Sequence, residues 1–111
     1  MNTPDNYFVE AILKNEVTIY CTLKEKVVFL KVIGAKRDWF WKKTWSLSFE
    51  SKKEMINILM KLNESGAAFS FDEHGWGPSS VFIHYRDEGL VQGEIVEIFW
   101  IGGGKYRTRK R

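Results

Sequence analysis

One amphipathic helix, with extended segments before and after it, is the feature that most restricts how this chain can fold. Ser51 and Glu54 have the spacing of a capping box, in which the serine hydroxyl caps the third helical amide and the glutamate accepts from the cap amide. Gly66 provides a left-handed stop. Between them, apolar residues recur at helical spacing, at Met55, Ile56, Ile58, Leu59 and Leu62. We therefore predict a helix over about residues 52–64, with one face on a core.

The remaining apolar segments have the alternation or the β-branched content of strands. Four precede the helix, at residues 7–13, 16–23, 26–33 and 38–49, and three follow it, at residues 67–72, 80–86 and 90–101. Lys14-Asn15 predicts a hairpin turn between the first two, and Asp87-Glu88-Gly89 predicts a turn between the last two. The predicted fold class is α+β, a twisted antiparallel sheet of about six or seven strands with one α-helix packed on a face.

The 111 residues fit a single domain, which we predict to span residues 1–104. Three glycines, residues 102–104, predict a flexible hinge that releases residues 105–111 as a basic C-terminal tail. The first residues carry acidic groups and no basic leader, and no apolar run approaches the roughly 18 residues of a membrane span. Cys21 is the only cysteine and alternates with apolar residues, which predicts a buried, reduced thiol. We expect a cytoplasmic protein.

Charge is divided unevenly along the chain. Residues 105–111 carry five basic side chains, whereas residues 62–104 carry seven acidic side chains and only one basic side chain, Arg86. An acidic surface of this kind attracts a lysine- and arginine-rich protein, and an exposed tryptophan can anchor the interface. The predicted partner-binding residues are Asp72, Glu73, Trp76, Asp87, Glu88, Glu94 and Glu97.

The segment RDWFWKKTW, residues 37–45, contains three tryptophans whose role the sequence leaves open. Trp39, Trp41 and Trp45 share a parity with Leu47 and Phe49, which favours a strand that faces the core. Strict alternation would also bury Lys43, so either a bulge interrupts the strand or its first half is exposed. In the alternative function, a single-stranded nucleic acid would contact Trp39, Trp41, Lys105, Arg107 and Arg109.

Residues 72–80, DEHGWGPSS, form the longest irregular loop and contain two carboxylates and a histidine. A metal site would combine Asp72, Glu73 and His74 with His84, but no element carries a spaced pair of histidines. A hydrolase would use His74 as a base, and no nucleophile at a strained turn accompanies it. We therefore predict a non-enzymatic protein with no metal or cofactor.

The chain resembles the small immunity proteins of bacterial toxin–immunity pairs, especially those of contact-dependent growth inhibition systems. The segment WGPSSVFIHYRDEGLVQGEIVEIFWIGGG, residues 76–104, looks most like the C-terminal hairpin of such a protein. The resemblance implies tight binding to a cognate toxin domain, often a nuclease, whose active site or substrate path is thereby blocked. These families share no universal motif, so the resemblance assigns no residue a role.

Overall fold

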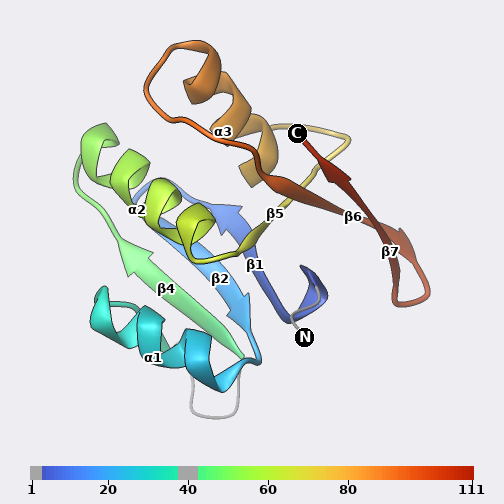
Figure 1. Ribbon diagram of the computed structural model, residues 1–111, viewed down its shortest axis with the longest axis horizontal. Coiled ribbons are helices and arrows are strands. Elements are labelled where there is room, and N and C mark those ends of the chain that lie inside the picture. The colour runs from blue at the N-terminus through green and yellow to red at the C-terminus, as the bar shows by residue number, and fades with distance from the viewer. Residues whose placement is uncertain (1–3, 38–42) are drawn as a thin grey trace.

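A mixed β-sheet forms the centre of the molecule (Figure 1). The structure is a computed structural model and describes residues 4–37 and 43–111. In these residues the strands are β1 (Tyr7–Ile12), β2 (Glu16–Cys21), β3 (Lys36–Arg37), β4 (Thr44–Ser48), β5 (Ala68–Ser70), β6 (Val96–Gly102) and β7 (Lys105–Lys110). The helices are α1 (Lys24–Val32), α2 (Lys52–Glu64) and α3 (Pro78–Asp87), after a 3-10 turn, η1 (Pro4–Asn6).

The strand order is β3-β4-β2-β1-β5-β6-β7, and three neighbouring strands, β1, β5 and β6, run parallel. The other neighbours are antiparallel, including the predicted hairpin of β1 and β2. The α+β class is confirmed, but the wholly antiparallel sheet is wrong. The reason is that α3 connects β5 to β6. It returns the chain to the edge of the sheet at which β5 began, so that β6 can run parallel to β5.

Helix α2 confirms the sequence prediction closely. Ser51 Oγ accepts a hydrogen bond from the Glu54 amide at 3.2 Å, and Glu54 Oε2 accepts from the Glu50 amide at 2.9 Å, one residue before the predicted cap amide. Gly66 follows the helix with φ at +96°. Met55, Leu59 and Leu62 are buried.

Two further helices replace predicted strands, so the single helix of the prediction is wrong. Residues 24–32 form α1, which buries Leu30 and leaves Val28 and Val32 exposed. A strand over the same residues would have had to cover apolar side chains on both faces. Residues 78–87 form α3, and Pro78 lies in its first turn, where its missing amide costs no helical hydrogen bond.

The last predicted strand begins later than expected, and the basic residues that follow it are not a tail. β6 begins at Val96, and residues 105–110 form β7, which pairs with it in an antiparallel hairpin. Gly102 ends β6, and Gly103 and Gly104 make the turn of this hairpin instead of a flexible hinge; all three have positive φ. The acidic and basic segments of the chain are thereby brought into register.

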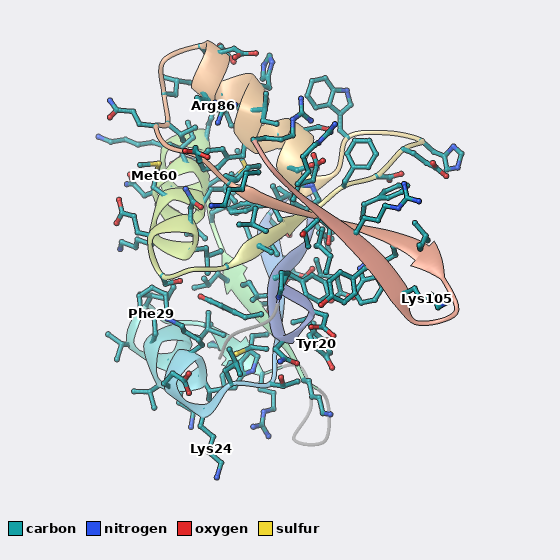
Figure 2. The ribbon with its side chains drawn as sticks, turned by 45° about the vertical axis from the view of Figure 1, so that its right-hand side comes forward. Tyr20, Lys24, Phe29, Met60, Arg86 and Lys105 are labelled. Carbon is teal, nitrogen blue, oxygen red and sulfur yellow. The ribbon has the colours of Figure 1, made fainter. Side chains whose placement is uncertain are left out.

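The two faces of the sheet differ in their cover. The main core lies between one face and the helices, and it contains Cys21, Trp45 and Leu47, as their strand parity predicted. Phe49 packs at its edge, whereas Lys43 precedes β4 and is exposed. The side chains of Phe29 and Met60 lie on the helical side in Figure 2, and Tyr20 lies toward the other side. A smaller apolar cluster lies on that second face, and none of the described helices lies over it.

Candidate functional site

Aromatic side chains from four strands lie in a row on the open face of the sheet. Phe8 of β1 stacks on Tyr20 of β2 with ring centroids 5.2 Å apart, and its ring centroid lies 6.0 Å from that of Trp100 of β6. Trp100 in turn meets Tyr106 of β7 edge to face at 5.4 Å. Ala68 of β5 is buried between β1 and β6, and its small side chain leaves room for the rings to meet.

A groove of about 740 Å³ opens beside this row. β5 is only three residues long, and its register with β1 ends at the pair Val9 and Phe69. Beyond this point β1 turns toward β2 while the chain after β5 leads to α3, and parallel strands whose connections diverge in this way leave a crevice at their carboxyl ends. The lining residues are Asp5, Asn6, Phe8, Glu10, Ala11, Ile12, Tyr20, Ser70, Phe71, Asp72, Trp76, Gly77, Pro78 and Trp100.

The charged side chains in the described lining of the groove are all acidic. Asp5, Glu10 and Asp72 contribute carboxylates, and none of the described residues that line the groove is basic. Asp5 Oδ1 accepts a hydrogen bond of 3.2 Å from the Tyr106 hydroxyl. Desolvation and the nearby Asp5 carboxylate raise the pKa of Tyr106. An aromatic, negatively charged groove has the surface chemistry that attracts lysine and arginine side chains.

The loop between β5 and α3 forms one wall of the groove. Asp72 Oδ1 accepts from the His74 amide at 2.9 Å, which closes a local turn typical of aspartate. A Cβ atom at Gly77 would lie 2.8 Å from the Asp72 amide nitrogen and 3.1 Å from the Ser70 carbonyl oxygen. The loop therefore closes on itself, and Trp76 at its end is left 71% exposed at the rim of the groove.

Of the predicted partner-binding residues, the structure places Asp72 and Trp76 in the described lining of the groove, and Trp76 also lines a second hollow together with Asp87. Glu73 lies in the same loop but outside the lining, where its Oε1 is 3.2 Å from His74 Nε2. Asp87 and Glu88 lie at the opposite end of α3, where Glu88 Oε1 contacts His84 Nε2 at 2.8 Å. Glu94 precedes β6 and is exposed.

Glu97 does not lie on an exposed acidic surface. Its side chain is buried within the hairpin and accepts hydrogen bonds from Arg109 and Arg111. The sequence prediction failed here because it treated the basic residues as a separate tail and so left Glu97 without an internal partner.

The residues of the alternative nucleic-acid hypothesis are divided by the structure. Trp39 and Trp41 lie outside the described residues. Lys105, Arg107 and Arg109 occupy alternate positions of β7 and therefore share one of its faces. That face is opposite to the one that carries Tyr106 and the aromatic row, so these cations do not reach the groove.

Sequence reasoning missed most of the groove, including Asp5, Phe8, Glu10, Tyr20 and Trp100. The sequence did contain one signal of the groove, which is the alternation of aromatic residues with buried residues along a strand. Tyr20 alternates with the buried residues Ile19 and Cys21 and therefore points to the opposite face. An aromatic side chain at such a position indicates a second apolar surface.

No family model, no curated protein and no solved structure matches this chain. Over the described ranges, 4–37 and 43–111, no three histidine, cysteine, aspartate or glutamate side chains are grouped so as to hold a metal ion. None of the helices in those same ranges has the length and apolar character needed to cross a membrane. Fold and groove together define an α+β domain with an acidic and aromatic sheet face that the described helices do not cover.

Proposed function

We propose that this chain is a non-enzymatic binding protein that recognises a basic surface on a protein partner. The observation that carries the proposal is the groove itself, in which Asp5, Glu10 and Asp72 surround aromatic side chains without a basic residue in the described lining. Carboxylates steer a basic partner toward the surface, and partly exposed tryptophans are frequent anchors of interfaces.

The class of partner that we propose is a toxin of a bacterial toxin–immunity pair, with this chain as the immunity protein acting in the cytoplasm. A nuclease toxin binds its nucleic acid through lysine and arginine side chains. A protein that covers such residues with its own carboxylates blocks the substrate path without any chemistry. Support for this mechanism comes from the arrangement of carboxylates beside Trp76 and Trp100 along one continuous groove.

Binding is proposed in preference to catalysis because of where the two histidines lie. The side chain of His74 is 86% exposed and lies beside Glu73, and that of His84 contacts Glu88 on α3. Both lie outside the groove lining. A general base would instead have to lie within hydrogen-bonding reach of a bound substrate.

The experiment uses a groove variant with a matched control. The triple variant Asp5→Asn, Glu10→Gln, Asp72→Asn removes the carboxylates of the groove, whereas Glu16→Gln, Glu50→Gln, Glu64→Gln removes the same charge outside the groove lining. Association with a partner captured from the native cell is measured with purified proteins, together with protection of cells against that partner. We expect the groove variant to associate about tenfold more slowly at low salt and the control to change by less than about twofold.

A probe that needs no partner tests the same groove. A tetra-arginine peptide should shift the tryptophan fluorescence of the wild-type protein and should shift that of the groove variant less. Equal association rates for the groove variant and its control would contradict the proposal. So would a peptide-induced fluorescence shift that is the same for the wild type and the groove variant.

A further inference from the structure

The β6–β7 hairpin has a second surface on the face turned away from the groove, and Phe71, which lines the groove, also borders this surface. Register places Phe99 opposite Arg107 and Glu97 opposite Arg109, so these four side chains share that face. Phe71 packs against Phe99 with ring centroids 5.4 Å apart. A hollow of about 370 Å³ lies over them, lined by Phe71, Glu97, Phe99, Arg107, Thr108 and Arg109. We call Phe71, Phe99, Lys105, Arg107 and Arg109 the basic platform.

The charge of the basic platform is opposite to that of the groove. Both Arg109 and Arg111 contact the single carboxylate of Glu97, at 2.9 and 3.2 Å, so the carboxylate is neutralised within the hairpin. Lys105 and Arg107 are exposed, and neither has a hydrogen-bond or ion-pair partner in the part of the chain that the structure describes. Arg107 lies beside the two phenyl rings in the lining of the hollow, and Lys105 lies farther along the same face of β7, so both cations are left available to a ligand.

The helices leave this surface uncovered. The hairpin projects away from α1 and α2 in Figure 1, and Lys105 marks its far end in Figure 2. A basic edge strand also has a purely protective use, since lysine and arginine on an edge discourage pairing with other chains. That use does not require aromatic rings beside the cations, whereas a ligand that combines flat rings with negative charge would use both.

We propose that the basic platform binds single-stranded nucleic acid, with bases against Phe71 and Phe99 and phosphates at Lys105 and Arg107. Sequence-tolerant binding to single strands combines base stacking on aromatic side chains with cations that follow the backbone. This inference goes beyond the proposed function, because it uses the opposite face of the hairpin and a ligand of the opposite charge.

The test compares two cations of the same strand. Fluorescence anisotropy of a labelled ten-nucleotide mixed-sequence oligonucleotide, as DNA and as RNA, gives the affinity at low salt. Arg107→Gln removes a charge from the basic platform, and Lys110→Gln removes one from the other face of β7, where Lys110 is paired with Val96. We expect the first to weaken binding at least threefold more than the second. For contacts to two phosphates, a plot of the logarithm of the affinity against the logarithm of the salt concentration should have a slope of about −1.4.

A second variant separates stacking from folding. Phe99→Leu keeps an apolar side chain in the hairpin but removes the ring, and it should weaken oligonucleotide binding about tenfold while the urea unfolding midpoint stays close to that of the wild type. Three results would overturn the inference: no binding at low salt, equal effects of Arg107→Gln and Lys110→Gln, or competition by poly-glutamate as strong as that by an unlabelled oligonucleotide of the same charge. The last would identify an acidic protein segment as the ligand.

Discussion

Arg109 faces Glu97 across the β6–β7 ladder and donates two hydrogen bonds to its Oε1, at 3.2 Å from Nε and 2.9 Å from Nη2. The Glu97 side chain is only 4% exposed, whereas that of Arg109 is 62% exposed. The pair is therefore asymmetric: the carboxylate depends on its partners, but the guanidinium can be hydrated without them. Arg111 adds a second cation to the same carboxylate.

This asymmetry predicts how stability responds to removal of each charge. Arg109→Ala alone should lower the free energy of unfolding by less than about 1 kcal/mol, because Arg111 still pairs with Glu97 and the lost side chain was largely solvated. The double variant Arg109→Ala, Arg111→Ala leaves a buried carboxylate without a counter-charge and should cost about 3 kcal/mol. Urea unfolding measures both, with Arg107→Ala as the control on the same face. Additive, small losses would show that Glu97 is solvated in the folded protein.

Removal of the Ser79 hydroxyl should raise the free energy of unfolding, whereas the arginine variants lower it. This hydroxyl lies in the first turn of α3, is buried and has no hydrogen-bond partner among residues 4–37 and 43–111. Burying an unpaired hydroxyl costs free energy, so Ser79→Ala should raise the free energy of unfolding by about 1 kcal/mol. Ser80→Ala is the matched control, because it makes the same change of helix propensity at a half-buried position. Thermal unfolding of the two variants isolates the hydroxyl, and a less stable Ser79→Ala protein would show that the hydroxyl has a partner.

The parts of the fold that were predictable from the sequence are those with local signals. The capping box at Ser51 and the apolar stripe of α2 are complete within fifteen residues, and the parity of Trp45 and Leu47 correctly indicated a buried face. Residues 24–32 carried no such signal. A short run rich in valine and leucine satisfies helix and strand patterns alike, and only the surrounding core determines that Leu30 is covered and Val32 is not.

The candidate site was harder to predict because it depends on contacts between distant segments. Asp72 and Trp76 were found because they lie in a conspicuous loop, but Asp5 and Trp100 meet only through the order of β1, β5 and β6. The same applies to β7. Its basic residues resemble a solvated tail until Glu97 is placed opposite Arg109, a pairing that no local pattern encodes.

The raised pKa of Tyr7 predicts that the folded protein loses stability in alkaline solution. Burial raises its pKa from 10.0 to about 12, although a 2.6 Å hydrogen bond with Ser65 Oγ lowers it. In the unfolded chain Tyr7 loses its proton near pH 10, whereas the folded protein retains it until about pH 12. The unfolded state therefore binds fewer protons over this range. The contribution of Tyr7 is complete below pH 10 and decreases as the pH rises to 12.

The measurement is urea unfolding of the wild type and Tyr7→Phe at pH 8, 10 and 11.5. Two pKa units correspond to about 3 kcal/mol, so the wild type should lose more stability than the variant by up to that amount. At pH 8 the variant should be less stable by about 1 kcal/mol, because it lacks the hydrogen bond to Ser65. Parallel curves for the two proteins would show that the Tyr7 hydroxyl is solvated.

Gly77 connects stability with the shape of the groove. A Cβ atom there would meet the Asp72 amide nitrogen at 2.8 Å and the Ser70 carbonyl oxygen at 3.1 Å, and both are backbone atoms that cannot rotate away. Gly77→Ala should therefore displace the loop that carries Asp72 and Trp76, at a cost of about 1–3 kcal/mol in unfolding free energy. Gly75→Ala is the control in the same loop, since its nearest neighbour would be Asp72 Oδ2 at 3.9 Å. Tryptophan fluorescence with the tetra-arginine peptide should show a weakened response for Gly77→Ala and an unchanged one for Gly75→Ala. Equal responses would mean that the position of this loop does not shape the ligand surface.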